Sequence, residues 1–352
     1  MIKPVEWLGD RLRLLDQTEL PLKEIYLDIT DYHDAVSAIK DLKVRGAPAI
    51  GIAAAYGIAL GALSIPYKDR AAFIESFDSI LGDFARSRPT AVNLFRSISI
   101  MKNTASQHKN VENILKALVK TAKSIQANEE KAMQCLSQYG AELLHDGCTV
   151  LTHCNTGTLA TGVRYGTAIG VIQAAVEQGK RISVYADETR PLMQGSRLSM
   201  WELMQLKIPA TLITDSMAGY ILKRHETDYV IVGADRIASN GDTANKIGTY
   251  SVAVLAAENH VPFYIAAPTS SIDLSIESGE DIPIEQRAPE EVLGIKGIRI
   301  APEKARALNP AFDVTPHKYI AGIITEKGII KKPFKRNINL TLQEVSQCRK
   351  PA

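Results

Sequence analysis

The sequence lacks the short motifs that accompany a bound nucleotide, a catalytic zinc ion or a serine nucleophile. The patterns G-x-x-x-x-G-K-[ST], G-x-G-x-x-G, H-E-x-x-H and G-x-S-x-G are all absent, and the four cysteines match no zinc spacing. These absences disfavour nucleotide-binding proteins, zinc proteases and serine hydrolases. We therefore expect no cofactor and no metal.

An excess of charge of one sign is also missing. The formal net charge is +2, which gives no electrostatic reason to expect nucleic acid or an anionic membrane as a partner. The stretch 49–65 carries no charge, but its seventeen residues are rich in Ala and Gly and fall short of the roughly 20 needed to span a bilayer. It is predicted to be a tightly packed buried helix.

The N-terminus carries charges too early and too often for a secretory leader. The cysteines are accordingly predicted to stay reduced, without disulfides, in a cytoplasmic protein. They are Cys135, Cys148, Cys154 and Cys348.

What the chain does contain is typical of a globular protein of two domains. It has 352 residues, 45% hydrophobic and 23% charged. Residues 1–135 predict a smaller domain of helices with a short antiparallel sheet. Residues 136–352 alternate apolar runs rich in β-branched residues with helical windows, which predicts an α/β, Rossmann-like domain with a parallel sheet. The predicted strands are 148–153, 182–186, 210–214, 229–232 and 262–266.

In such sheets the ligand lies beyond the carboxyl ends of the strands, so the residues after each run are the candidates for a site. Cys154 follows the first run and precedes a predicted helix whose dipole could favour a thiolate. A small buried hydrophobe is the alternative for Cys154. His153 is predicted to be a hydrogen-bonded core histidine outside the site.

Asp235 follows the fourth run, where partial desolvation could raise its pKa toward acid–base duty. The alternative is a structural pairing with Arg236 or Arg190. Asn245 and Lys246 are predicted to open the next helix, where an amide and an ammonium can bind phosphate.

Two arginines in the N-terminal half complete the candidates. Arg45 precedes Gly46 and Ala47 at a predicted helix start, a plausible phosphate cradle. Arg88 lies just before a second predicted helix, led by a proline.

The loop after the second run, which includes Gln194, is polar enough to bind a ligand.

The sequence resembles the methylthioribose-1-phosphate isomerase family of methionine salvage over about residues 5–332. The resemblance is carried by six stretches: 42–51, 87–94, 189–197, 232–237, 241–249 and 315–317. It implies conversion of 5-methylthioribose 1-phosphate to 5-methylthioribulose 1-phosphate by a homodimer, with a site in a cleft between the domains. The same fold serves regulatory subunits of a translation initiation exchange factor and ribose-1,5-bisphosphate isomerases.

The resemblance assigns catalysis to Cys154 and Asp235, with Asp235 as the proton donor. The substrate contacts that it implies are Arg45, Gly46, Ala47, Arg88, Gln194, Asn245 and Lys246. Two alternatives remain open at this point: a non-catalytic regulatory subunit, and an enzyme for ribose 1,5-bisphosphate or 5-deoxyribose 1-phosphate. A direct hydride shift is favoured over an enolate route, because no strong base stands in the motifs.

Overall fold

The computed structural model describes residues 2–89 and 91–343; Cys348 lies outside them. The chain divides into two compact units. Unit 1 contains the residues up to Lys131 together with the short segment Thr158–Arg164. Unit 2 contains Ala132–Gly157 and the chain from Tyr165 onward. Thr158–Arg164 thus belongs to unit 1, although it lies beyond the boundary predicted at residue 135.

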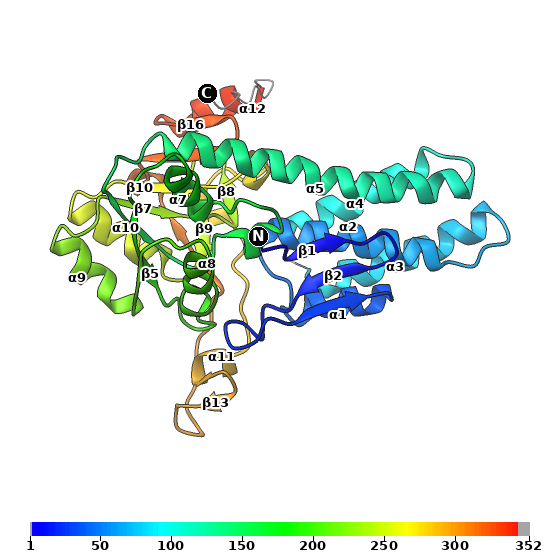
Figure 1. The fold of residues 1–352 in the computed structure, drawn as a ribbon, viewed down its shortest axis with the longest axis horizontal. Coiled ribbons are helices and arrows are strands. Elements are labelled where there is room, and N and C mark those ends of the chain that lie inside the picture. Colours follow the sequence, from blue (N-terminus) through cyan, green and yellow to red (C-terminus); the bar gives the residue numbers. More distant parts are fainter. Residues whose placement is uncertain (1, 90, 344–352) are drawn as a thin grey trace. The chain divides into compact units, whose positions relative to one another are not determined.

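Unit 1 combines a small antiparallel sheet with helices, as the sequence predicts (Figure 1). Its strands are β1 (Val5–Trp7), β2 (Leu12–Leu15) and β3 (Tyr26–Ile29). Its helices are α1 (Tyr32–Lys40), α2 (Ala47–Ser64), α3 (Arg70–Ser87), α4 (Val92–Ser106), the first part of α5 (Val111–Ala141), and α6 (Thr158–Thr161). Asp31 caps α1 by accepting a hydrogen bond from the His33 amide, so the helix begins where the sequence pattern changes.

Helix α2 is the core of unit 1. It is long and apolar enough to cross a membrane, but 78% of it is buried, which is the behaviour of a core helix. Its glycines allow close packing: a Cβ on Gly57 would lie 2.5 Å from the ring of Phe84 in α3. The prediction of a tightly packed buried helix for this stretch is confirmed.

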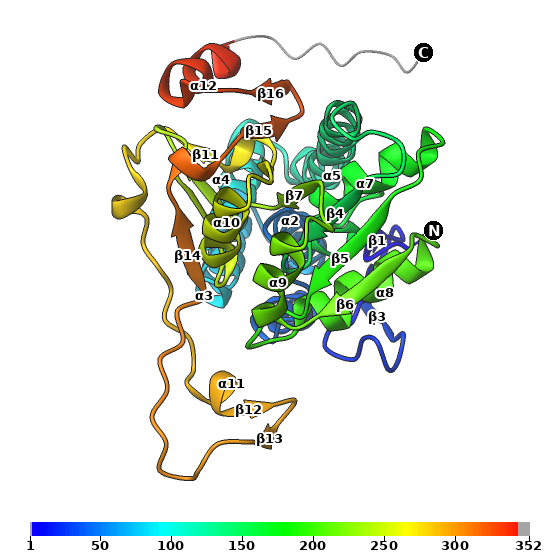
Figure 2. The ribbon, with the colours of Figure 1, turned by 90° about the vertical axis from the view of Figure 1, so that its left-hand side faces the viewer.

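Unit 2 is built on a seven-stranded sheet in the order β16-β15-β10-β7-β4-β5-β6 (Figure 2). All neighbours are parallel except β16, which runs antiparallel to β15. The strands are β4 (Thr149–Thr152), β5 (Ser183–Asp187), β6 (Ala210–Ile213), β7 (Tyr229–Val232), β10 (Phe263–Ala266), β15 (Gly322–Thr325) and β16 (Gly328–Ile330). All five predicted strands are therefore present, and the Rossmann-like fold class is confirmed.

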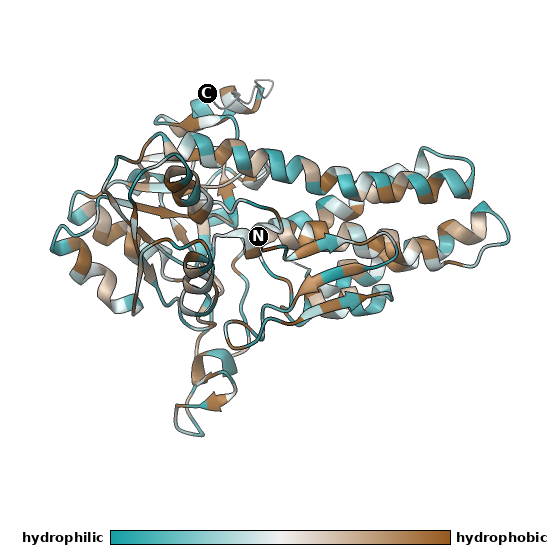
Figure 3. Ribbon diagram, in the orientation of Figure 1, coloured by the Kyte–Doolittle hydropathy of each residue, from teal (hydrophilic) through white to brown (hydrophobic). Residues whose placement is uncertain are grey.

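The central strands of the sheet are rich in hydrophobic residues (Figure 3), and consecutive residues in them, such as Val230, Ile231 and Val232, are buried. Helices therefore cover both faces of the sheet. Helices α9 (Ala218–Lys223) and α10 (Thr249–Glu258) pack on one face and bury Leu222 and Val252 in a shared core. The crossovers through α7 (Ala168–Glu177) and α8 (Met200–Gln205) run from β4 to β5 and from β5 to β6. Right-handed crossovers in that direction place α7 and α8 on the opposite face.

A second, four-stranded sheet of unit 2 was not predicted. Its order is β11-β8-β9-β14, with β8 (Arg236–Ala238), β9 (Thr243–Lys246), β11 (Ile272–Asp273) and β14 (Phe312–Thr315). An arm formed by α11 (Glu290–Leu293), β12 (Gly294–Ile295) and β13 (Ile298–Arg299) lies between β11 and β14 along the chain, and α12 (Phe334–Gln343) ends the described chain. The sheet matters for function because β9 carries two of the candidate residues.

Candidate functional site

The order of the large sheet reverses between β4 and β7, the two neighbouring strands from which the chain departs in opposite directions. In open α/β sheets this reversal opens a crevice at the carboxyl ends of the strands, where ligands bind. Cys154 comes two residues after β4, and Asp235 comes three residues after β7. The structure therefore brings the two predicted catalytic residues of unit 2 to the same edge of the sheet.

Cys154 is held by its backbone in a buried loop. Its amide donates to Thr189 Oγ1 at 2.9 Å, and its carbonyl accepts from Ser199 Oγ at 2.7 Å. Its φ is +67°, in the left-handed region that non-glycine residues seldom adopt. Only 7% of Cys154 is exposed. Strained backbone of this kind persists where surrounding structure enforces it, as it often does at functional sites.

The helix expected directly after Cys154 is much shorter than predicted. Helix α6 spans only four residues, and the next helix, α7, begins at Ala168. A single turn sums few peptide dipoles, so it offers little stabilisation to a thiolate. Cys154 and Cys148 are free thiols, but Cys135 is in a disulfide, so the expectation of fully reduced cysteines is wrong for Cys135.

His153 is buried and hydrogen-bonded, as predicted. Its Nδ1 lies 2.9 Å from Asp187 Oδ2, and its Nε2 lies 2.9 Å from the carbonyl oxygen of Ile247. Burial lowers the pKa of His153, but the hydrogen bond and charge of Asp187 more than offset this, so its pKa is raised. Burial also raises the pKa of Asp187. The pair therefore keeps the proton between its two side chains.

The loop after β5 is organised by Asp215. Its two carboxylate oxygens accept from the amides of Thr189 and Arg190, at 2.8 and 2.7 Å. Gly195 begins a π-helix (Gly195–Ser199), and a Cβ there would lie 1.6 Å from the carbonyl oxygen of Asp187, so only glycine fits. π-helical turns are rare and are frequent at functional sites.

Gln194 precedes that turn and has a buried polar side chain. It is 2% exposed, and its Oε1 is buried without a hydrogen-bond partner in the described structure. A buried acceptor without a partner costs roughly 1 to 3 kcal/mol. A ligand hydroxyl could donate to this oxygen; the role of Gln194 in substrate binding stays a prediction.

Asn245 and Lys246 end a strand and do not open a helix, so the prediction for their local structure is wrong. They belong to β9, and α10 begins only at Thr249, after Gly248 with φ +105°. The reason is long-range pairing: Asn245 faces Asp313 and Lys246 faces Phe312 in the antiparallel partner β14. Local sequence carries no information about that partner.

The two side chains are nevertheless buried and fixed. Asn245 Nδ2 donates to Thr249 Oγ1 at 3.0 Å. Lys246 Nζ donates to the carbonyl of Ala311 at 2.9 Å and lies 4.2 Å from the ring centroid of Phe312. The amide of Asp235 donates to the Ala244 carbonyl at 2.9 Å, so Asp235 lies beside β9. Asp235, Asn245 and Lys246 are therefore part of one backbone network.

The alternative structural pairing of Asp235 with its neighbouring arginines finds no support in the contacts of those arginines. Arg236 Nη1 lies 3.8 Å from Asp273, and Arg190 donates to the carbonyls of Val292 and Gly294 in the arm. Arg190 thereby ties the arm to the loop after β5.

Unit 1 carries the remaining candidates. Gly46 caps α2 with φ +92°, and a Cβ there would lie 2.2 Å from the carbonyl oxygen of Ala160, so glycine is required. Arg45 and Ala47 flank this glycine at a helix start with no acidic residue in its first turn. Such an end presents unpaired amides to an anion. Arg88 is the C-cap of α3, and the next helix, α4, begins at Val92.

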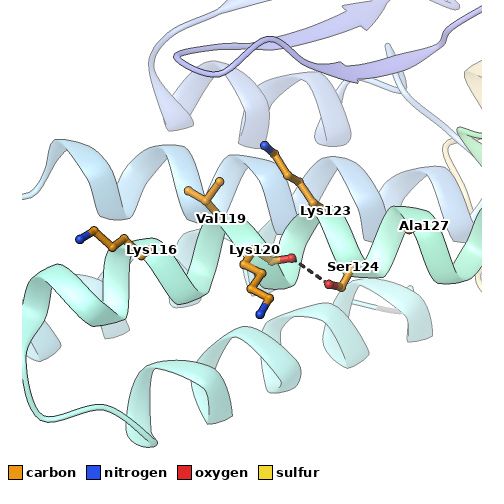
Figure 4. Close-up of a pocket in the computed structure, with 6 residues that line it drawn as sticks. All are labelled: Lys116, Val119, Lys120, Lys123, Ser124 and Ala127. Atoms are coloured by element: carbon orange, nitrogen blue, oxygen red, sulfur yellow. Dashed lines mark hydrogen bonds between the residues drawn. The ribbon is translucent and has the colours of Figure 1, made fainter.

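A shallow pocket on unit 1 lies elsewhere, along one face of α5 (Figure 4). It is lined by Lys116, Val119, Lys120, Lys123, Ser124 and Ala127. These residues recur at helical spacing, and none is a predicted site residue. We assign it no role in catalysis.

His153, Asp187 and Asp215 also meet the spacing of a metal site, since one ligand atom from each lies within 4.8 Å of the others. Both ring nitrogens of His153 are hydrogen-bonded, and both oxygens of Asp215 accept backbone amides. Asp187 bonds His153 through Oδ2, while its Oδ1 is buried without a hydrogen-bond partner in the described structure. The hydrogen bonds of the other four ligand atoms go to neighbouring protein groups, chiefly in the loops around Cys154. The sequence analysis did not assign Asp187, Thr189 and Asp215 to the hydrogen bonds around Cys154. Their positions at or just after the ends of β5 and β6 could have indicated it.

The fold is that of an α/β protein with a Rossmann-like sheet, in which Cys154 and Asp235 follow the two strands at the switch point. The family model described as the Initiation factor 2 subunit family matches residues 43–332. The methylthioribose-1-phosphate isomerase of Geotalea uraniireducens is 52% identical over 96% of this chain and 97% of its own length. The crystal structure of 5-methylthioribose 1-phosphate isomerase from Pyrococcus horikoshii superposes with a TM-score of 0.92 at 42% identity, covering 97% of this chain and 96% of that one.

A third relative bears a different name. The crystal structure of the translation initiation factor eIF-2B, subunit delta, from A. fulgidus gives a TM-score of 0.88 at 43% identity, covering 98% of this chain and all of that one. The chain belongs to the Initiation factor 2 subunit family, and within it to the methylthioribose-1-phosphate isomerases.

Proposed function

We propose that this protein is an enzyme of methionine salvage that converts 5-methylthio-α-D-ribose 1-phosphate to 5-methylthio-D-ribulose 1-phosphate. The observation that carries the proposal is the position of Cys154 and Asp235 after the two strands that meet at the switch point. Relatives that share about half of the residues over nearly the whole chain bear the name of this isomerase.

The chemistry starts at the ring oxygen. The anomeric oxygen carries phosphate, so the ring cannot open to a free aldehyde by the usual route. We assign Asp235 as the acid that protonates the ring oxygen and breaks its bond to C1. The ring oxygen becomes the C4 hydroxyl. The C2 hydroxyl proton leaves as the ketone forms, which restores the proton given up at the start.

Hydrogen must also move from C2 to C1. We favour transfer of a hydride, which carries its electron pair to the electron-deficient C1. The burial of Cys154 supports a dry environment for the cationic species formed on ring opening. In the competing enolate route Cys154 would take the C2 proton and return it to C1. The weak dipole of α6 gives that thiol little help as a base.

Phosphate binding is assigned to Arg45, Gly46, Ala47, Arg88, Asn245 and Lys246, with Gln194 as a contact to a hydroxyl group. The support for this assignment differs between the units. In unit 2, Lys246 and Asn245 are buried and fixed, and Gln194 has a buried acceptor without a partner. In unit 1, Gly46 is the N-cap of α2 with φ +92°, and the first amides of this helix have no partner within the helix.

A regulatory subunit of the initiation-factor type is the second candidate, because the A. fulgidus protein of that name is 43% identical. Sugar phosphates with other groups at C5, ribose 1,5-bisphosphate and 5-deoxyribose 1-phosphate, are the third. These three candidate functions are distinguished by incubating the purified chain with each of the three sugars and measuring ketose formation. Turnover of the methylthio sugar at the highest kcat/KM is expected; no turnover of any sugar would favour the regulatory subunit.

The same proposal includes a cytoplasmic homodimer that acts on a small sugar phosphate, without nucleic acid, membrane, metal or cofactor. The near-neutral net charge supports the absence of nucleic acid and of an anionic membrane as partners, and the isomerase name of the relatives supports a small sugar phosphate as the substrate. Light scattering coupled to gel filtration tests the dimer: a mass of one chain would exclude it.

A further inference from the structure

We propose that the buried His153–Asp187 pair is a positioning device for catalysis, which holds the Cys154 loop against the Ile247–Gly248 turn. The role as a device for this reaction rests on the proposed isomerase function. The physical claim, that the pair fixes the position of the Cys154 thiol, can be tested without turnover.

The two hydrogen bonds of the His153 ring define its protonation and orientation. A carbonyl oxygen only accepts, so the bond of 2.9 Å to Ile247 places a hydrogen on Nε2. The bond of 2.9 Å from Nδ1 to Asp187 Oδ2 then contains one shared proton, either on the imidazolium or on the carboxylic acid. In both forms the ring is held at both ends. It also packs on Gly248, where a Cβ would lie 2.8 Å from Cε1.

Asp187 reaches the neighbour of His153 as well. Thr189 Oγ1 donates to the carbonyl oxygen of Asp187 at 3.1 Å and accepts from the Cys154 amide at 2.9 Å. The side chain of Asp187 thus holds residue 153, and its backbone holds residue 154 through Thr189. Together these bonds keep Cys154 at its unusual φ of +67°.

The turn on the other side of the ring leads directly from Lys246. Ile247 accepts from His153, and the amide of Gly248 donates to Asp313 at 2.7 Å. The groups whose charge acts on His153 are the carboxyls of Asp187, Asp215 and Asp313. This acidic surrounding favours retention of the shared proton, and with it the hydrogen bonds that join the thiol loop to the lysine strand.

The side chains of His153 and Asp187 are 1% and 0% exposed, and both ring nitrogens of His153 are hydrogen-bonded, so the ring is not expected to touch substrate. Asp187 gives Oδ2 to His153, and its Oδ1 is buried without a hydrogen-bond partner in the described structure. His153 and Asp187 are positioning residues. A displacement of a reacting group by about 1 Å can cost on the order of 100-fold in rate. Loss of the pair should therefore lower kcat more than it raises KM.

The test compares Asp187→Ala, Asp187→Asn and His153→Gln in the full chain. Asparagine can donate its amide to a neutral Nδ1 and so preserves both bonds, whereas alanine removes one. We expect Asp187→Ala and His153→Gln to lower kcat by about 10- to 100-fold, and Asp187→Asn to retain most of it. His317→Ala is the matched control, because His317 pairs with Asp242 at 2.6 Å at a half-exposed position.

A second readout is the rate at which iodoacetamide alkylates Cys154 in the native protein, resolved by mass spectrometry, with Cys148 as the internal reference. Asp187→Ala should change the Cys154 rate several-fold and leave Cys148 unchanged. Equal changes at both thiols, or wild-type kcat and alkylation in Asp187→Ala and His153→Gln, would overturn the proposal. If the wild type turns over no sugar, the isomerase function fails, but the alkylation result still judges the positioning claim.

Discussion

The backbone amide of Cys154 donates to the side-chain hydroxyl of Thr189 at 2.9 Å, across 35 positions of the chain. Thr189 is fully buried, with φ +63°, and its hydroxyl also donates to Asp187. One hydroxyl therefore connects the loops that follow β4 and β5. The conformation of the loop around Cys154 therefore depends on this hydrogen bond to another loop as well as on its own sequence.

Replacing Thr189 by valine keeps the shape of the side chain but leaves the Cys154 amide without its acceptor. The free energy of unfolding should fall by about 1 to 3 kcal/mol, the cost of a buried unsatisfied donor, and kcat should fall with it. Thr189→Ser retains the hydroxyl and is the matched control. Urea unfolding and initial rates measure both effects. Equal values for the two variants would contradict the role given to the hydroxyl.

Cys154→Ala and Asp235→Asn should abolish most turnover while the fold remains intact. General acid–base groups contribute roughly 100- to 10,000-fold, so kcat should fall within that range. Cys148→Ala removes the other free buried thiol and should keep near-wild-type kcat. Steady-state kinetics and circular dichroism suffice. Near-wild-type kcat in either catalytic variant would remove that residue from its assigned role.

Arg45→Ala and Lys246→Met should weaken the binding of any phosphorylated ligand. A charge-assisted hydrogen bond contributes about 1.5 to 3 kcal/mol, or about 10- to 100-fold in Kd. Isothermal calorimetry with the product measures the change. Arg86→Ala is the matched control, since Arg86 is 73% exposed and pairs with Asp83. Unchanged affinity in Arg45→Ala would exclude Arg45 from the site.

Activity should survive prolonged dialysis against a chelator. The expectation rests on the absence of metal-ligand spacing in the sequence and on the internal hydrogen bonds that use the ligand atoms of His153 and Asp215. Assays before and after dialysis, with added divalent cations, make the measurement. Loss of turnover that a single metal restores would refute the metal-free reading.

Substrate deuterated at C2 distinguishes the two routes for hydrogen. A hydride shift in ordinary water keeps the label at C1 of the product, whereas an enolate open to solvent loses some of it. We expect retention, measured by mass spectrometry or NMR of the ketose. Substantial washout would reject the hydride shift and make Cys154 the base.

The apolar runs of the sequence predicted the fold class, because a strand buried on both faces must be apolar along its length. For the same reason, the sequence predicted that Cys154 and Asp235 each follow a strand of the sheet. The local structure of Asn245 and Lys246 was not. Polar residues before an apolar helical window resemble a helix start, and their actual pairing is with β14, almost seventy positions later.

By itself, then, the amino-acid sequence determined five of the seven strands of the large sheet, their order along the chain and the chemical groups that follow them. The tertiary structure alone decided which groups meet. The bonds of His153 to Asp187 and Ile247 span 34 and 94 positions, and the Cys154 amide finds its acceptor in another loop. Hydrogen bonds of this kind depend on the registers of neighbouring parallel strands, which fix the loops in space and leave no periodic trace in the sequence.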